Sequence, residues 1–359
     1  MISINIREYL DSYEKYASND FDTIFKNHLT KLHEFHNLKC LEYKNISEKI
    51  FNISHTKAIK KIENFPFLPV DIFKKYEIFS CKSDDIYKIL KSSGTSNQVP
   101  SKIFLTKENA RDQSIGLLKI FKSFTKLNRP NLIIIDSPDL IKDKKSFNAR
   151  VAGIIGFRSL SKKAIYGLNN KYELEIEKIE NFIDENHDHD LLIFGFTWII
   201  FKYFINKNLP KSLKEKLSNS VLLHGGGWKK IEDLSVSKRE FNDIVKERSG
   251  IKRVISYYGM IEQTGSIFLE CENGYLHTNP LANIICRSES NLKTNEINKR
   301  GLAQVLSAIP TSYPGHSLLT DDIVEIKHYN NCPCGRKGLA FIVHGRAKKT
   351  EIRGCSDTL

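Results

Sequence analysis

Hydrophobic residues recur at helical spacing along residues 1–64, a stretch that contains neither glycine nor proline. Apolar positions three and four residues apart share one face of a helix, so this stretch is typical of amphipathic helices. Pro66 and Pro69 follow it, and proline cannot continue a helix. The pattern predicts an N-terminal helical layer over residues 1–64.

A second pattern begins at Ile86, where short β-prone runs alternate with longer amphipathic ones. This alternation is typical of βα units that build a largely parallel sheet with helices on its faces. We expect strands over 86–90, 132–135, 191–194, 221–224, 254–257 and 266–270. We expect helices over 107–122, 173–185, 198–205 and 237–247.

The helical pattern stops near residue 270, and short strands separated by turns follow, including 323–327 and 339–344. The sequence therefore predicts an α/β fold in three parts. These are the helical layer 1–64, an α/β core over 65–270 with mostly parallel sheets, and a small β-rich closing segment over 271–359.

Composition narrows the class of protein. Of 359 residues, 40% are hydrophobic and 27% charged, which excludes collagen, low-complexity disorder and disulfide miniproteins. The longest apolar run, 191–201, is too short to span a bilayer, and Arg7 and Glu8 interrupt any secretory signal. Seven cysteines, an odd number, fit a reducing compartment. We expect a cytoplasmic protein.

The formal net charge is +13, which can attract nucleic acid or an anionic membrane surface. Lysines supply most of this charge and are spread along the whole chain. We interpret the charge as solvated surface and expect neither nucleic acid nor a membrane span. A nucleic-acid binder stays open as a hypothesis that rests on charge alone.

The first stretch that can carry chemistry follows the strand expected at 86–90 and contains Ser92, Ser93, Gly94, Thr95 and Ser96. Hydroxyl groups and free backbone amides in such a loop can donate hydrogen bonds to a phosphate. The spacing is not that of a P-loop. An ordinary surface turn is the alternative interpretation.

Two further stretches follow expected strands. Gly225, Gly226 and Gly227 come after an apolar run, and the missing Cβ atoms let a planar ligand approach the chain. In an open α/β sheet, ligands bind beyond the carboxyl ends of the strands. A flexible loop is the alternative. His224 borders this loop, and core packing or an orienting hydrogen bond suits it better than acid/base chemistry.

Tyr258, Gly259 and Glu262 follow the strand expected at 254–257. They can supply an aromatic face, a close turn and one hard oxygen ligand for Mg²⁺. Near the end of the chain, Asp322 precedes a strand and suits a ribose diol. Arg346 lies in a basic, turn-rich stretch. Taken singly, each stretch also fits an ordinary turn.

Cys332 and Cys334 form a C-x-C pair in a turn, and Cys271 and His277 lie upstream. Together they can complete a Cys₃His set for structural Zn²⁺. The spacing differs from standard zinc patterns, which use C-x₂₋₄-C. Reduced turn cysteines are the alternative.

The order of these stretches resembles that of the adenylate-forming enzymes, in which a carboxylate attacks ATP to give an acyl adenylate. The resemblance spans residues 91–354. The segments HGGGWKK and YGMIEQTGS are most similar in sequence to those of acyl-protein synthetases of the LuxE type, which activate fatty acids for a reductase complex. The C-x-C-G-R segment is similar to one in phenylacetate-CoA ligases.

The resemblance implies that the core over 65–270 binds nucleotide and acyl group, and it implies roles for these residues. Ser92, Ser93, Thr95 and Ser96 would bind the ATP phosphates, with Gly94 permitting the turn. Gly225, Gly226, Gly227 and Tyr258 would enclose the adenine, with Gly259 in the turn that follows. Glu262 would hold Mg²⁺, Asp322 the ribose hydroxyls, and Arg346 the ribose or the α-phosphate side.

The chain also departs from the superfamily pattern. Asn97 and Ser101 stand where the phosphate loop usually carries glycine and lysine, and lysines replace the acid that usually follows G-R. Because the sequence stops at Leu359, we expect the mobile C-terminal lid domain, with its catalytic lysine, to be missing.

Cys355 is the candidate acyl acceptor. Lys348, Lys349 and Arg353 precede it, and nearby cations favour a nucleophilic thiolate. Its position near the C-terminus resembles that of the acylated cysteine of acyl-protein synthetases. An inert tail thiol is the alternative.

We therefore expect a ligase that uses ATP and Mg²⁺ to convert a long-chain carboxylic acid to acyl-AMP. The acyl group would then pass to Cys355 and on to a partner reductase or acyl-carrier protein. The competing hypotheses are a shortened phenylacetate-type CoA ligase and a non-catalytic nucleotide-binding scaffold.

Overall fold

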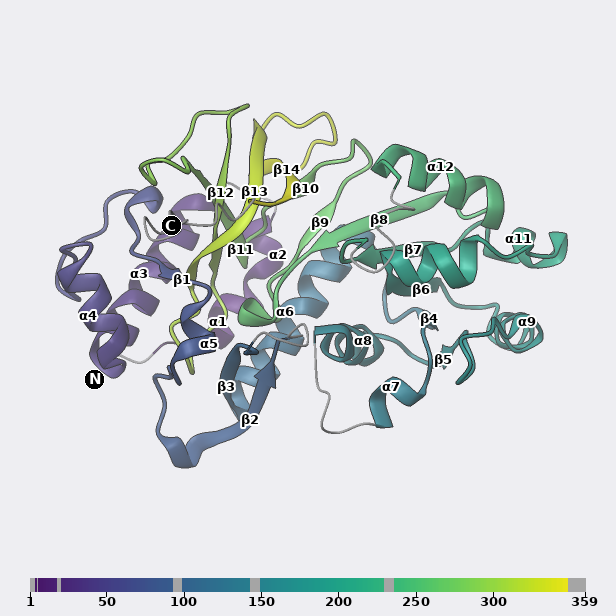
Figure 1. Cartoon of the computed structure of the whole chain (residues 1–359), viewed down its shortest axis with the longest axis horizontal. Coiled ribbons are helices and arrows are strands. Elements are labelled where there is room, and N and C mark those ends of the chain that lie inside the picture. The colour runs from purple at the N-terminus through teal and green to yellow at the C-terminus, as the bar shows by residue number, and fades with distance from the viewer. Residues whose placement is uncertain are drawn as a thin grey trace, which may run out of the picture.

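The structure is a computed structural model that describes residues 4, 6–17, 21–92, 99–142, 149–228 and 236–347. Its strands and helices form the α/β arrangement that the sequence predicts (Figure 1). Most strands belong to one large sheet, and the pair β2–β3 stands apart from it.

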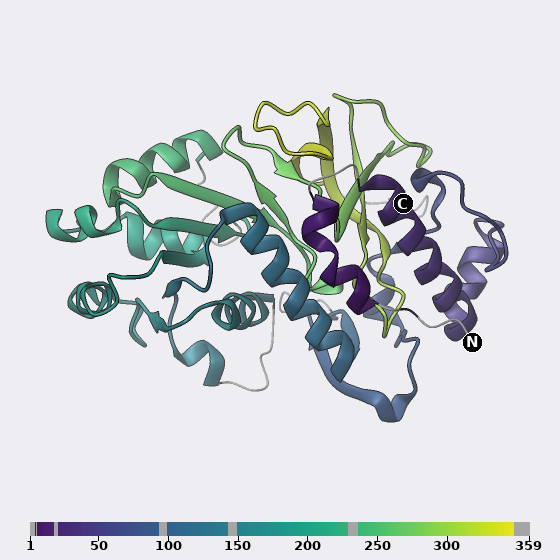
Figure 2. The same cartoon turned by 180° about the vertical axis from the view of Figure 1, so that it is seen from behind.

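The N-terminal helices are α1 (Ile6–Asp11), α2 (Tyr13–Ala17), α3 (Asp22–Lys39) and α4 (Leu41–Lys49). The longest, α3, buries Phe25, Leu29 and Leu32, which recur at the spacing of one helix face. Helices α1 and α2 pack against α6 on the side of the molecule that Figure 2 shows. A short connection, η1 (Ile62–Asn64), β1 (Leu68–Pro69) and α5 (Ile72–Lys75), then leads to the sheets.

The hairpin β2 (Ile86–Lys91) and β3 (Lys102–Thr106), preceded by η2 (Ser83–Asp85), runs directly into α6 (Lys107–Thr125). Thr106 begins that helix, because its Oγ1 accepts a hydrogen bond from the Asn109 amide at 3.2 Å, the usual N-cap interaction. The Asn109 side chain then donates to the Ile309 carbonyl at 2.9 Å. The hairpin and the helix are thereby fixed to the C-terminal part of the chain.

Five strands form the parallel half of the large sheet, in the order β5-β4-β6-β7-β8. Apolar residues fill both faces of these strands, as expected for a parallel sheet covered on both sides. One face packs against α6 and α8, and the other packs against α9 to α12. Their bounds are β4 (Asn131–Ile135), α7 (Asp139–Lys142), α8 (Ala149–Leu160), β5 (Ala164–Tyr166), α9 (Ile176–Asp184), β6 (Leu191–Phe196), α10 (Thr197–Ile200), η3 (Phe201–Ile205), α11 (Lys211–Leu217), β7 (Val221–Gly225), α12 (Lys238–Ser249) and β8 (Arg253–Tyr258).

The C-terminal strands extend the same sheet in the order β9-β10-β14-β13-β12-β11, with antiparallel pairing throughout. Strand β8 joins the halves, because it pairs parallel with β7 and antiparallel with β9. Strand β1 adds to β13. Their bounds are η5 (Ile261–Gln263), β9 (Phe268–Glu270), β10 (Leu276–His277), β11 (Ala282–Arg287), β12 (Arg300–Ser307), β13 (Ser317–Tyr329) and β14 (Leu339–Arg346).

All eight expected strands overlap observed ones, and the expected helices match α6, α9, α10 with η3, and α12. Two segments differ from these expectations. The segment predicted as a helix over 198–205 begins as an α-helix and continues as a π-helix. Helix α8 was not predicted, because Gly153 and Gly156 weaken the helical pattern. Across the described ranges, no helix is both long and apolar enough to cross a membrane.

Candidate active site

The Gly-rich loop begins at the carboxyl end of β7, where Thr197 at the end of β6 fastens it. The Thr197 Oγ1 atom lies 2.9 Å from His224 Nδ1 and 2.9 Å from the Gly226 carbonyl oxygen. Burial lowers the pKa of His224 to about 3, so its imidazole stays neutral at neutral pH. His224 therefore orients the loop, in line with the predicted orienting hydrogen bond.

The three glycines of this loop meet different requirements. A Cβ on Gly225 would lie 2.3 Å from Tyr257 Cε1, and Gly226 has a φ of +77°. Both positions therefore need glycine for the fold itself. A Cβ on Gly227 would meet no described atom within 4 Å. Among the described atoms, Gly227 therefore leaves room for a ligand beside the loop.

Tyr258, Asp322 and Arg346 meet at the seam between the two halves of the sheet. Tyr258 donates a hydrogen bond to Asp322 Oδ2 at 2.7 Å, and Arg346 Nε lies 3.6 Å from Asp322 Oδ1. Burial and the neighbouring Asp322 carboxylate raise the pKa of Tyr258 well above its ordinary value, which keeps it a hydrogen-bond donor.

A β-bulge places Arg346 opposite Asp322. The pairing of β13 with β14 shifts between Ile323 and Val324, and Gly345 there has a φ of +109°. Such a bulge turns the following side chain in a new direction. The registered pair is Asp322 with Arg346.

Glu262 lies in the short helix η5 that follows β8. It is only 6% exposed, and burial raises the pKa of its carboxyl, against opposing effects of Ser101, Lys74 and Arg346. The turn before it needs Gly259, because a Cβ there would lie 2.9 Å from Ile267 Cγ2. A buried carboxylate whose ionised form is disfavoured is suited to bind a cation.

Ser92 and Ser101 close the base of the hydroxyl-rich loop. The Ser92 amide donates to the Ser101 carbonyl at 3.1 Å, and the Ser101 amide donates to Ser92 Oγ at 2.8 Å. Because Ser101 neighbours Glu262, the base of this loop lies beside the carboxylate. The predicted phosphate-binding residues Ser93, Gly94, Thr95 and Ser96 lie outside the described residues, as does Cys355.

Among the described members of the predicted nucleotide site, Tyr258, Asp322 and Arg346 meet directly, and Ser92 is linked to Glu262 through Ser101. Gly225 pairs in register with Tyr257, the residue before Tyr258. Gly226 and Gly227 follow Gly225 along the chain, and Gly259 lies between Tyr258 and Glu262. Three neighbours were not predicted: Thr197, Ser101 and Lys74. Thr197 lies in the short gap between the strand predicted over 191–194 and the helix predicted over 198–205, which was an available signal. No sequence signal marked Lys74, because a Lys-Lys pair is typical of any solvated surface.

A second group of predicted residues gathers away from the nucleotide site. The ligand atoms of Cys271, His277, Cys332 and Cys334 all lie within 4.8 Å of one another. His277 pairs with Ala340, next to Leu339 at the start of β14. Arg346 is the last residue of the same strand. The two groups therefore lie at opposite ends of β14.

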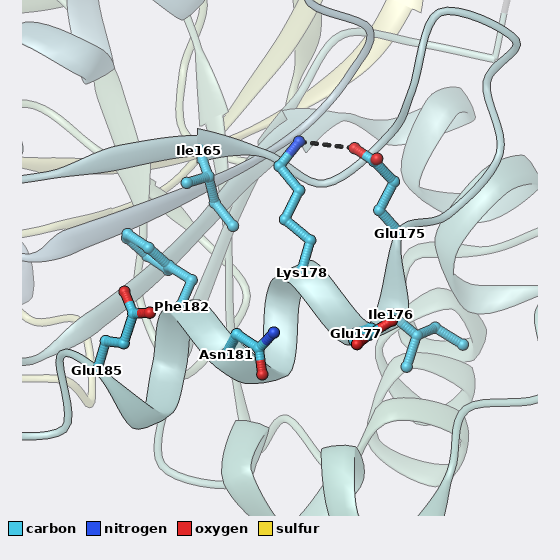
Figure 3. Close-up of a pocket in the computed structure, with 8 residues that line it drawn as sticks. All are labelled: Ile165, Glu175, Ile176, Glu177, Lys178, Asn181, Phe182 and Glu185. Atoms are coloured by element: carbon cyan, nitrogen blue, oxygen red, sulfur yellow. Dashed lines mark hydrogen bonds and ion pairs between the residues drawn. The ribbon is translucent and has the colours of Figure 1, made fainter.

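A groove of about 570 Å³ lies beside α9 and Ile165 of β5. Figure 3 shows that charged side chains line it, with Lys178 paired to Glu175 at 2.6 Å. No residue of the predicted nucleotide site contributes to its lining. This groove is thus distinct from the candidate active site.

Known proteins are similar to this chain in sequence and in fold. A family model described as acyl-protein synthetase, LuxE, matches residues 10–359. A long-chain-fatty-acid–luciferin-component ligase of Aliivibrio fischeri is 22% identical over 339 residues, covering 90% of this chain and 84% of that protein.

Solved structures of 2-hydroxyisobutyryl-CoA ligase share the fold. One, an open conformation in complex with 2-HIB-AMP and CoA, has a TM-score of 0.69 at 14% identity, covering 90% of this chain and 74% of that one. Another, in the postadenylation state with 2-HIB-AMP, has a TM-score of 0.69 at 14% identity, covering 90% and 67%. At this identity the likeness concerns the fold alone.

Proposed function

Because the chain belongs to the acyl-protein synthetase (LuxE) family, we propose that it activates a long-chain fatty acid with ATP and passes the acyl group to a protein thiol. Membership makes it a ligase with the adenylate-forming fold. The name of the Aliivibrio fischeri relative, a long-chain-fatty-acid ligase, supports a fatty carboxylate as the substrate.

One observation carries the proposal: the stretch that holds Tyr258 and Glu262, Asp322 of β13 and Arg346 of β14 meet at one seam of the sheet. In the proposed site, Asp322 accepts hydrogen bonds from the ribose hydroxyls, and Arg346 neutralises charge near the α-phosphate. The adenine lies between Tyr258 and the segment of Gly225, Gly226 and Gly227. Ser92 and the loop of Ser93, Gly94, Thr95 and Ser96 donate to the phosphates.

Glu262 suits Mg²⁺, because it is a hard oxygen donor that is buried and whose charged form gains from a cation. When bound, Mg²⁺ neutralises charge on the phosphates and the leaving pyrophosphate. The residues around Glu262 would hold the nucleotide in place. In phosphoryl transfer, such positioning supplies much of the catalysis.

The first step joins the carboxylate to AMP. A carboxylate oxygen of the fatty acid attacks the α-phosphorus of ATP. The bond between the α-phosphorus and the oxygen that bridges it to the β-phosphorus breaks, and pyrophosphate leaves with that electron pair. Arg346 and the hydroxyl-rich loop stabilise the charge that develops.

The second step transfers the acyl group. The Cys355 thiolate attacks the carbonyl carbon of the acyl adenylate, a thioester forms, and AMP leaves. Lys348, Lys349 and Arg353 precede this cysteine, and their charge favours the thiolate. An acyl reductase or acyl-carrier partner then takes the acyl group from Cys355.

Exchange of labelled pyrophosphate into ATP tests the first step. We expect exchange that depends on an added long-chain carboxylic acid, and at least a roughly 100-fold loss in Glu262→Gln. Unchanged stability of that variant would show that the loss is chemical. Absence of exchange across a panel of carboxylic acids would leave the non-catalytic scaffold.

Labelled fatty acid with MgATP tests the second step. We expect label on the protein, lost in Cys355→Ala and kept in the matched variant Cys81→Ala. Label that never enters the protein, together with AMP release that requires coenzyme A, would favour the phenylacetate-type CoA ligase. The partner reductase is tested by transfer of that label to it.

A further inference from the structure

Three sulfur atoms and one imidazole come together at the end of β14, although they belong to two separate turns. Cys271 and His277 lie on either side of the turn between β9 and β10, and Cys332 and Cys334 lie between β13 and β14. Their ligand atoms all lie within 4.8 Å of one another, and Cys334 Sγ is 3.3 Å from His277 Nε2. This spacing suits four donors around one small ion.

Both turns are held in shape by main-chain hydrogen bonds. The Cys271 amide donates to the Tyr275 carbonyl at 2.8 Å, and the Gly335 amide donates to the Cys332 carbonyl at 2.9 Å. Gly274 and Gly335 have φ values of +80° and +78°, which glycine adopts at little cost. The donors are therefore fixed by the backbone of the turns before any ion binds.

The surroundings of the cluster are also suited to an ion. His277 is 2% exposed, and its Nε2 atom faces the Cys334 sulfur at 3.3 Å, away from solvent. Arg336 lies two residues beyond Cys334 and donates to Glu272 at 2.9 Å, with its guanidinium 4.1 Å from the centre of the Phe124 ring.

We propose that Cys271, His277, Cys332 and Cys334 bind one Zn²⁺ ion as a structural site. Three thiolates and an imidazole are soft and intermediate ligands that favour zinc over magnesium or calcium. Four protein ligands complete a tetrahedron and leave no open position for a substrate. The ion therefore links the β9–β10 turn to the β13–β14 turn and takes no part in acyl activation.

This link stabilises the end of β14 that lies opposite Arg346. Strand β10 is only two residues long and pairs with both β9 and β14. Short strands contribute few main-chain hydrogen bonds, so an ion that joins their turns adds stability that the unfolded chain lacks.

Elemental analysis of the full-length protein, purified without chelators, tests the site. We expect about one zinc per chain, and less than about a tenth of that in the double variant Cys332→Ser/Cys334→Ser. The matched variant Cys81→Ser removes a partly buried thiol elsewhere and keeps its zinc. Removing zinc with a chelator is expected to lower the Tm by about 5 °C or more, and adding Zn²⁺ alone restores it.

Cobalt(II) substitution is a second readout that does not depend on how well the variant folds. Tetrahedral thiolate coordination gives strong visible absorption, and we expect this signal in the wild-type protein. Metal-free wild-type protein that gains neither Zn²⁺ nor the cobalt signal would overturn the proposal. So would full zinc content in the double variant, or a disulfide among these cysteines in freshly purified protein.

Discussion

Asp322 is the residue that two other predicted side chains contact directly: it accepts a hydrogen bond from Tyr258 and faces Arg346 at 3.6 Å. These two neighbours fix the orientation of the carboxylate. A carboxylate held in this way accepts hydrogen bonds from a diol without further ordering.

The substitution Asp322→Asn tests the role of this carboxylate toward ATP. The amide would keep the shape of the side chain but lose the charge, and hydrogen bonds to charged groups contribute about 1.5–3 kcal/mol. We expect the KM for ATP in pyrophosphate exchange to rise about 10-fold or more. Asp321→Asn is the matched control, because adjacent strand residues point to opposite faces, and equal effects of both changes would refute the assignment.

The residues of the candidate site were predictable where a motif marked them. The order of the stretches from Ser92 to Arg346 indicated one nucleotide site, and the structure brings Tyr258, Asp322 and Arg346 together. That these residues bind a nucleotide stays a prediction. Ser101 was seen only as a departure from a family pattern. Ser101 reaches the site because the base of the β2–β3 hairpin lies next to Glu262. A single sequence does not show such a tertiary contact.

At the scale of elements, buried histidines connect the N-terminal helices to the rest of the molecule. His36 of α3 lies 2.7 Å from Ser80 Oγ and 3.1 Å from the Pro310 carbonyl oxygen. Tyr43 of α4 lies 3.0 Å from His316. Burial lowers the pKa of His36 to about 3 and of His28 to about 4.

These histidines predict that acid weakens the folded state. An unfolded histidine takes up a proton below about pH 6.5, whereas the buried ones stay neutral down to pH 3–4. The unfolded state then binds more protons, so stability is complete above about pH 6.5 and falls as the pH falls. For His36 alone we expect a loss of about 2 kcal/mol between pH 7 and 5.

Urea unfolding at pH 7 and pH 5 measures this loss. His36→Gln keeps one donor and one acceptor in place but cannot titrate. We expect the variant to lose less stability than the wild-type protein over the same pH interval. An identical loss in both proteins would contradict the assignment to His36.

Secondary structure was most predictable where apolar runs were long. The strands at Leu191–Phe196 and Val221–Gly225 extend the predicted ranges by one or two residues. Strand β12 (Arg300–Ser307) was not predicted, because turns and charged residues surround it and mask its β pattern. Its identity as a strand depends on pairing with β11 and β13, which are distant along the chain.

In the molecule as a whole, the candidate site lies where the large sheet changes from parallel to antiparallel pairing, at β8. Parallel strands supply the Gly-rich loop, and antiparallel strands supply Asp322 and Arg346 (Figure 1). The sequence predicted both groups of strands, but it predicted neither the antiparallel pairing of the second group nor that the two groups join in a single sheet. The boundary expected at residues 270 and 271 falls in the turn between β9 and β10 of that sheet, and the three-part division stays a prediction.

A crystal structure of the protein with a non-hydrolysable sulfamoyl analogue of a fatty acyl adenylate tests the central claim most directly. We expect the ribose hydroxyls to lie within hydrogen-bonding distance of Asp322 and the adenine to lie between Tyr258 and the Gly225–Gly227 segment. An analogue bound elsewhere, such as in the groove beside α9, would contradict that claim.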